Sequence, residues 1–431
     1  MALLRRLAIV VGCLSSGALA VQGTTNAHGQ TPSQSPAIAR MSTGADGLVA
    51  TGFAPLVGKR VGLVTNHTGR VGNERLIDVL ARAPNVRLVS ILTPEHGLGG
   101  SVEAGSRVDS GRDAATGIPI HSLYGRARRP TPAMLAGLDV LVFDIQDIGV
   151  RYYTYISTMG LVMQAAAAAR LPLIVLDRPN PLGGEDVAGF VLEPRRRSFV
   201  GLVAIPQVHG LTVGELARMI KGERLLPGLE GLLLEVVAMR GWRRDMRWPA
   251  TGLAWVATSP NVPTFETALV YAGVGLIEGT TASEGRGATE PFLRIGHPGV
   301  DGAALAAGLG KAGLPGVRFQ EEAFTPKSIP GMATRPKFEG RKIAGIRLFV
   351  TDPATFRPVE TGLHVLAALD AQVRTRDKTG IVPEGGMFDR LAGTSRLARQ
   401  LATGASAPAI IESWRAEAAA FKARRATYLM Y

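Results

Sequence analysis

The sequence predicts an α/β protein, in which a Rossmann-like, doubly wound and mostly parallel sheet domain is followed by a smaller α+β C-terminal domain. Short apolar segments alternate with helical segments up to about residue 298, which is typical of successive βαβ units. Residues 140–143 are continuously apolar, as expected for a strand buried on both faces of a parallel sheet. From residue 299 onward the pattern changes to mixed helices and strands, which indicates the second domain.

The individual elements are predicted from apolar periodicity and from the turn residues that bound each segment. Strands are expected at 60–66, 86–92, 140–143, 171–176, 204–210 and 343–350. Helices are expected at 73–82, 159–170, 213–220 and 362–374. For the helix at 213–220, Thr212 as N-cap and Glu215 three residues later form the two halves of a capping box.

The first 20 residues have the pattern of a cleavable secretory signal. Arg5 and Arg6 precede an apolar run over residues 7–19, which ends in Ala18-Leu19-Ala20. This run is shorter than the ~20 residues that a bilayer span requires, so stable membrane insertion is not expected. A membrane anchor and a lipid on Cys13 are the alternatives to cleavage.

The predicted signal is followed by a leader and by the two domains. Residues 21–43 are rich in Gln, Ser, Thr, Pro and Ala, which is typical of a flexible linker. The Rossmann-like catalytic domain is expected at 44–298, and the C-terminal domain at 299–431 is expected to close over its cleft. An exported protein of this kind would be periplasmic or extracellular.

Composition excludes several classes of protein. Cys13 is the single cysteine and lies in the predicted signal, so the mature chain would have no disulfide and no thiol nucleophile. The formal net charge is +13, and the basic residues are scattered rather than clustered with aromatic residues, so nucleic acid is not an expected partner. No nucleotide-binding glycine motif follows the first strand, and no cofactor is expected. The oligomeric state is left open.

Polar side chains gather in the turns that directly follow predicted strands. The carboxyl ends of parallel strands share one edge of a sheet, so these side chains are expected to line one cleft. They are Asn66 and His67, Glu95 and His96, Asp144, Gln146, Asp147 and Arg151, and Arg178 and Asn180. His209, near the start of a helix, and a second polar patch with Asn261, Ser283, Glu284 and Arg286 are added to the candidate site.

Eight ordered motifs resemble those of the NamZ-like exo-β-N-acetylmuramidases. The motifs are TNHTG (65–69), TPEHGLGG (93–100), LYG (123–125), VFDIQDIGVRYYTYI (142–156), LDRPNPLGG (176–184), HGLTVGE (209–215), SPNVP (259–263) and EGTTASEGRG (278–287). The resemblance implies a Rossmann-like domain, a smaller C-terminal domain, and release of N-acetylmuramic acid from the non-reducing ends of peptidoglycan fragments. Glu95 matches the glutamate of the family's PEHG motif, and residues 283–287 match its S-x-G-R-G loop.

The residues at the predicted sheet edge fit glycoside hydrolysis. This chemistry normally requires a protonated carboxyl group for the leaving oxygen and an ionised carboxylate as nucleophile or base. Glu95, on a turn that leaves an apolar strand, is the predicted acid. Asp144, Asp147 and Glu284 are the candidates for the second carboxylate, and the sequence does not choose among them.

The remaining candidates are expected to bind peptidoglycan-derived sugars. Muramic acid differs from N-acetylglucosamine by a lactyl ether that carries a carboxylate, so discrimination requires a fixed cation or several backbone donors. Arg286 is the leading prediction for that cation because a guanidinium can hold a carboxylate with two parallel hydrogen bonds. Arg151 and Arg178 are alternatives, and so is a purely structural ion pair between Arg286 and Glu284.

Two other functions compete with a glycosidase. A metal-dependent cell-wall amidase or deacetylase would use His67, His96, His209 and Asp144 as ligands, although no H-E-x-x-H spacing supports it. A non-catalytic cell-wall sugar-binding protein would keep the cleft and bind ligand without releasing product.

The N-terminal pattern predicts export with cleavage after Ala20. N-terminal sequencing of the secreted protein should therefore begin at Val21. A mature protein that retains Met1, or that carries lipid on Cys13, would show the assignment to be wrong.

Overall fold

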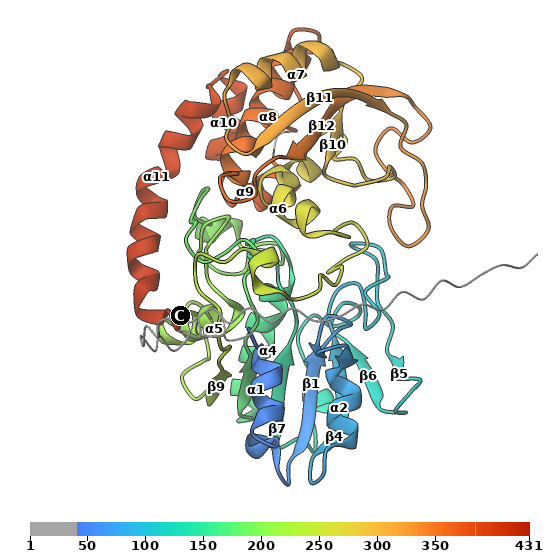
Figure 1. The fold of residues 1–431 in the computed structure, drawn as a ribbon, viewed down its shortest axis with the longest axis vertical. Helices are drawn as coiled ribbons and strands as arrows, with labels where there is room; N and C mark the ends of the chain where they lie inside the picture. Colours follow the sequence, from blue (N-terminus) through green and yellow to red (C-terminus); the bar gives the residue numbers. More distant parts are fainter. Residues whose placement is uncertain (1–40, 384) are drawn as a thin grey trace, which may run out of the picture. The chain divides into compact units, whose positions relative to one another are not determined.

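A computed structural model describes residues 41–383 and 385–431 of the chain (Figure 1). The predicted signal at 1–20 and nearly all of the predicted leader lie outside the described residues. The described residues all belong to one compact unit. Within these ranges no helix is long and apolar enough to cross a membrane.

A sheet of seven strands forms the centre of the N-terminal part, in the order β5-β6-β4-β1-β7-β8-β9 (Figure 1). All pairings are parallel except that of β5 with β6 at one edge. This confirms the predicted doubly wound, mostly parallel sheet. The strands are β1 (Arg60–Thr65), β4 (Arg87–Thr93), β5 (Gly111–Arg112), β6 (Pro119–Ser122), β7 (Val140–Asp144), β8 (Leu173–Leu176) and β9 (Leu234–Val237).

The strand order reverses at β1. From β1 the chain moves outward to β4 and β6, returns to β7 on the other side of β1, and continues to β8 and β9. Thr65 at the end of β1 is paired with Asp144 at the end of β7. In open sheets of this kind, ligands bind outside the carboxyl ends of the strands at the point of reversal. This edge is therefore where a site is expected.

Helices cover the sheet because its central strands need apolar partners on both faces; β7 is buried along its whole length. The helix α5 begins with the predicted capping box, in which the side chains of Thr212 and Glu215 each accept from the other's backbone amide. The helices of this part are α1 (Gly44–Ala50), α2 (Leu76–Arg82), α3 (Pro132–Leu135), α4 (Tyr155–Ala169) and α5 (Val213–Gly222), whereas α6 (Phe265–Val274) lies with the C-terminal part, where it packs against α8 (Pro358–Arg374) (Figure 1).

The C-terminal part is built on a smaller antiparallel sheet in the order β10-β12-β11, which confirms the predicted α+β class. One cluster of buried apolar side chains continues from β7 and α4 into helices of this part. The exact boundary expected at residue 299 stays a prediction. The elements are β10 (Arg294–Gly296), β11 (Val317–Phe324), β12 (Ile343–Val350), α7 (Gly302–Lys311), α8 (Pro358–Arg374), α9 (Met387–Ala392), α10 (Arg396–Ala402) and α11 (Ala407–Arg424).

Two predicted elements are corrected by the structure. The segment 204–210 is irregular rather than a strand, with single bridges from Val208 to Val150 and Ala188. Pro206 cannot donate to a sheet ladder, which explains why the apolar pattern is not realised as a strand. The helix expected at 73–82 begins only at Leu76, because the preceding residues pair in a short hairpin, β2 (Arg70–Val71) with β3 (Glu74–Arg75).

Arg151 connects the two parts of the chain. Its fully buried guanidinium donates to the carbonyl oxygens of Phe190 at 2.6 Å, Ile205 at 3.0 Å and Leu391 at 2.8 Å. Burial lowers the pKa of Arg151 to about 10, so the side chain is still charged near neutral pH. The position of α9 relative to the main sheet therefore depends on this arginine.

Replacing Arg151 with methionine should lower the free energy of unfolding by roughly 3 kcal/mol, because three carbonyl groups lose a charged donor. Denaturation followed by circular dichroism measures the change. The control is Arg195→Met, which removes an exposed ion pair with Glu193 and should cost less than about 1 kcal/mol. A similarly small cost for both variants would contradict a connecting role for Arg151.

Candidate active site

A cavity of about 310 Å³ lies at the carboxyl edge of the main sheet, where the turns after β4 and β7 meet segments of the C-terminal part. Four of the predicted site residues line it: Glu95, His96, Asn261 and Arg286. The volume is at the small end of the range of about 300–1,000 Å³ typical of ligand sites, which suits a single sugar ring.

Glu95 is held by hydrogen bonds to both carboxyl oxygens. It follows β4 directly, and only 7% of its surface is exposed. Oε1 accepts from the Gly105 amide at 2.8 Å, and Oε2 accepts from the Thr154 hydroxyl at 2.6 Å. The carboxyl group is therefore fixed between the turn after β4 and the turn after β7, and both of its donors are uncharged.

The two histidines beside this turn are fixed by the backbone. His96 has a left-handed backbone (φ 69°), and its Nδ1 lies 2.7 Å from the Val102 carbonyl oxygen. The Nε2 atom of His67 lies 2.5 Å from the Ala257 carbonyl oxygen, and Gly100 packs so closely on the His67 ring that a Cβ atom there would overlap it. Burial lowers the pKa of both histidines, so the rings are neutral near pH 7.

Glu278 is a second carboxylate in the cavity, and it was missing from the sequence-based candidates. It lies in the 3₁₀ helix η4 (Gly275–Gly279), and its Oε2 accepts from Nη2 of Arg286 at 3.2 Å. Its Oε1 has no hydrogen-bond partner among the residues described. Burial raises the pKa of Glu278, and the charge of Arg286 opposes that rise. Its place at the start of the EGTTASEGRG motif was the one signal in the sequence.

Lys337 holds the segment that carries Glu278. Its ammonium group contacts the Glu284 carboxylate at 2.9 Å, and Nε of Arg286 lies 3.4 Å from the same carboxylate. Glu284 thus forms ion pairs beside the cavity and lies outside its lining. Lys337 also donates to the backbone carbonyls of Ile277, Glu278 and Ala282. Its distance in sequence kept it from being predicted.

The two ends of the cavity differ in burial. Aromatic side chains close one end, called here the inner end; they are Tyr152, Tyr271 and Phe292, which are 2%, 7% and 0% exposed. Tyr124 and Val200, which are half-buried, border the other end, called the outer end, and Met387, which is 50% exposed, lies on α9, which packs against η4. Glu278 and Arg286 lie with the inner aromatics, since the guanidinium is 5.4 Å from the centre of the Phe292 ring.

Asp144 and Asp147 lie outside the lining of this cavity. Arg178 holds the Asp144 carboxylate with Nε at 2.5 Å and Nη2 at 2.9 Å. Burial raises the pKa of Asp144, and Arg178 opposes that rise. The Oδ2 atom of Asp147 accepts from the Gly149 amide at 2.6 Å, and burial raises the pKa of Asp147 to about 7.

The other predicted residues are also placed away from the lining. Gln146 and Arg178 border a neighbouring cavity of about 350 Å³ on the same sheet edge. The remaining predicted residues are buried. Four of them accept a hydrogen bond from a backbone amide two residues further along the chain: Asn66, Asn180, His209 and Ser283. Arg151 donates to three backbone carbonyls, as described above. Burial lowers the pKa of His209 to about 3.

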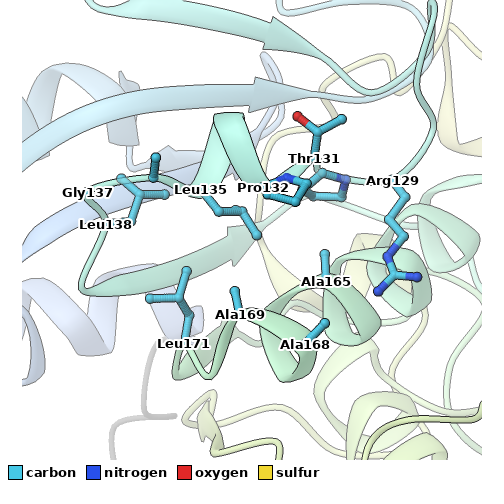
Figure 2. A pocket seen from close by; sticks show the side chains of 12 residues that line it. Arg129, Thr131, Pro132, Leu135, Gly137, Leu138, Ala165, Ala168, Ala169 and Leu171 are labelled. Atoms are coloured by element: carbon cyan, nitrogen blue, oxygen red, sulfur yellow. The ribbon is translucent and has the colours of Figure 1, made fainter.

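A larger groove of about 740 Å³ lies between α3 and α4 (Figure 2). Its lining is mostly alanine and leucine, with Arg129 at one side. Leu138 and Leu171 precede β7 and β8, so the groove lies at the amino ends of these strands, away from Glu95. It offers no carboxylate and no acid or base for hydrolysis.

The four metal ligands considered from the sequence do not form a site. No group of three or more His, Cys, Asp or Glu side chains in ranges 41–383 and 385–431 is placed to hold a metal ion. The Asp144 carboxylate forms an ion pair with Arg178, and the His67 and His96 rings are hydrogen-bonded to backbone carbonyls. A metal-dependent amidase or deacetylase thus has no ligand set in these residues.

A small cavity at the carboxyl edge of a Rossmann-like sheet, with two carboxylates and aromatic walls, is the arrangement of a glycoside hydrolase. Comparison with known proteins agrees. Residues 61–266 match the model for the N-terminal part of the exo-β-N-acetylmuramidase NamZ, and residues 269–431 match that for its C-terminal part. The chain therefore belongs to the NamZ family.

Individual relatives cover almost the whole chain. The peptidoglycan β-N-acetylmuramidase NamZ of Bacillus subtilis (strain 168) is 41% identical over 399 residues, which is 91% of this chain and 92% of the relative. A crystal structure of a DUF1343 family protein from Bacteroides fragilis has a TM-score of 0.82 and 36% identity, and covers 92% of this chain and 100% of that one. A second such protein from the same organism has a TM-score of 0.74 and 32% identity, with coverage of 91% and 99%.

Proposed function

We propose that this protein releases N-acetylmuramic acid from the non-reducing ends of peptidoglycan fragments by hydrolysis. The observation that carries the proposal is that Glu95 and Glu278 line one cavity of a size that suits a terminal sugar. Glycoside hydrolysis by carboxylates requires one group as proton donor and one as nucleophile or base. The Bacillus subtilis relative is named for this substrate.

Glu95 is the proposed proton donor, and Glu278 is the proposed ionised partner. The donors to Glu95 are an amide and a hydroxyl, whereas Glu278 accepts from the guanidinium of Arg286. Burial raises the pKa of Glu278 and the charge of Arg286 opposes that rise, so the ionised role proposed for Glu278 depends on its ion pair with Arg286. Glu278 thereby replaces the three earlier candidates, which lie outside the lining: Asp144, Asp147 and Glu284.

The shape of the cavity supports action at a chain end. Buried aromatic rings close the inner end, so a terminal sugar fits there and the chain continues toward the outer end. Asn261 also lines the cavity; its Nδ2 donates to the Met332 carbonyl at 2.8 Å, and its Oδ1 has no hydrogen-bond partner among the described residues. His96 and Asn261 are proposed to contact the sugar beside Glu95.

Arg286 is proposed to recognise the lactyl carboxylate. It lines the cavity, and its guanidinium already lies among carboxylates, with Glu278 at 3.2 Å and Glu284 at 3.4 Å. A carboxylate on the substrate could accept hydrogen bonds from the same guanidinium N–H groups. These ion pairs also fit a structural role, so the two roles have to be separated by experiment.

We also propose that the protein is exported to the periplasm or the exterior. The support is the sequence of residues 1–20 and the location of the proposed substrate in the cell wall.

Glu95→Gln and Glu278→Gln should each lower kcat/KM on the disaccharide N-acetylmuramyl-N-acetylglucosamine by about 10² to 10⁴. They should differ on β-N-acetylmuramyl fluoride, because fluoride leaves without protonation. Glu95→Gln should keep most of its activity on the fluoride, since only proton donation is lost. Glu278→Gln should lose activity on both substrates, since the group that assists attack is lost.

Asp147→Asn is the control, because Asp147 lies outside the cavity lining; it should retain far more activity than either variant. Loss of fluoride hydrolysis in Glu95→Gln with retention in Glu278→Gln would reverse the two roles. Binding of the disaccharide without product release by the wild-type protein would identify a sugar-binding protein instead.

Arg286→Lys should raise KM for the muramic-acid disaccharide more than for the lactyl-free analogue, di-N-acetylchitobiose. The expected difference is roughly 1.5–3 kcal/mol, the range for a hydrogen bond to a charged group. Steady-state kinetics on both substrates measure it.

Arg294→Lys is a matched control for this variant, since Arg294 also pairs with two carboxylates, Glu290 and Glu322, and lies outside the cavity lining. Arg294→Lys should change KM for the two substrates by the same factor. If Arg286→Lys also raises KM for both substrates equally, then Arg286 positions the loop and does not bind the lactyl carboxylate.

A further inference from the structure

The outer end of the cavity has a chemistry of its own. Tyr124 lines this end, and its hydroxyl is near the Glu95 carboxyl group. Burial and the charge of Glu95 raise the pKa of Tyr124, so the phenol stays a hydrogen-bond donor at all physiological pH values. Tyr271 at the inner end packs instead against Phe292 and Tyr152, with ring centres 4.6 Å and 5.4 Å apart.

A cation and two aromatic rings are assembled next to Tyr124. The rings of Tyr124 and Phe199 are 5.7 Å apart and tilted by 46°. The guanidinium of Arg128 lies over both rings, 4.9 Å from the centre of Tyr124 and 4.5 Å from that of Phe199. Val200, the residue after Phe199, lines the cavity, which brings this group to its rim.

The charge of Arg128 is available to a ligand. Arg128 is exposed, and in the part of the chain that the structure describes no carboxylate lies within ion-pair distance of it. Stacking on two rings restricts the guanidinium, which lowers the entropy lost when it donates to a ligand. Its neighbour Arg129 differs, since it donates to the Gln164 carbonyl and borders the groove at the opposite edge.

The direction of the substrate follows from the proposed function, on which this inference rests. If the terminal muramic acid occupies the inner end, Glu95 protonates the oxygen that leaves with the next sugar. That sugar must then lie on the outer side of Glu95, over Tyr124. Aromatic rings with a polar edge suit a pyranose, which has an apolar face and a hydroxyl rim.

We propose that Tyr124, Phe199 and Arg128 form the subsite for the leaving sugar, an N-acetylglucosamine residue. One face of the sugar rests on the aromatic pair, and Arg128 donates to its oxygen atoms. The subsite would then raise kcat/KM for substrates whose leaving group is a sugar, and it would not affect substrates with a small leaving group such as fluoride.

The test compares two substrates that share the inner sugar. The disaccharide N-acetylmuramyl-N-acetylglucosamine would place one sugar in the cavity and the other at its rim beside Tyr124, Phe199 and Arg128, whereas β-N-acetylmuramyl fluoride would occupy the cavity alone. Arg128→Gln should lower kcat/KM on the disaccharide by roughly 5- to 20-fold, in line with a stacked cation and its hydrogen bonds, and leave the fluoride unchanged. Phe199→Leu, which keeps an apolar side chain at a half-buried position, should show the same selectivity.

Arg129→Gln is the matched control and should leave both substrates unchanged. Equal losses on the two substrates, or no loss on the disaccharide in either variant, would overturn the leaving-sugar subsite. Failure of the wild-type enzyme to hydrolyse both substrates would instead overturn the proposed function, so the two failures are distinguishable. Thermal melting of each variant confirms that the comparison is made on folded protein.

Discussion

The buried ion pair between Asp144 and Arg178 is the interaction on which the geometry of the sheet edge depends. Asp144 ends β7 and Arg178 follows β8, so the pair joins two strand ends; Arg178 also donates to the Arg70 carbonyl beyond β1. Taking two charges out of water is costly, and it is tolerated here because the geometry is bidentate. The turn after β7 then leaves the sheet in a fixed direction. That turn carries Thr154, which holds Glu95 from the neighbouring turn.

A second set of charges positions the other side of the cavity. Arg286 and Lys337 lie beside two carboxylates; Glu284 is paired with both cations, and Glu278 is paired with Arg286 alone. Lys337 makes its remaining contacts to backbone carbonyls, so it fixes the path of the segment as well as its charge. The charge of Glu284 is thus balanced beside the cavity, while Oε1 of Glu278 has no hydrogen-bond partner among the described residues.

The sequence predicted the fold because apolar runs and capping residues act locally. The strands at β1, β4, β7 and β8 and the start of α5 are specified within a few residues, whereas the missed strand β9 has a weaker, half-exposed pattern. The segment around Pro206 shows the limit, since its apolar pattern resembles a strand and its proline prevents one.

The site was predicted less completely, for a different reason. Glu95 lies just after β4 and Asp144 is the last residue of β7, so the two look alike in sequence, yet Glu95 lines the cavity and Asp144 pairs with Arg178. Which of them meets substrate depends on partners that are distant in the chain. The same holds for Glu278, whose place in the cavity is visible only once Arg286 and the inner aromatic rings are placed around it.

The two carboxylates come from different family segments: Glu95 lies in residues 61–266, and Glu278 lies in residues 269–431. The cavity is thus assembled from both halves of the gene product, and neither half alone contains a complete pair. A fusion or rearrangement that kept only one half would inherit a sheet or a small domain with only part of the cavity lining. The complete cavity therefore requires both halves to be inherited together, and a genome fragment that matches one of them does not by itself indicate the proposed activity.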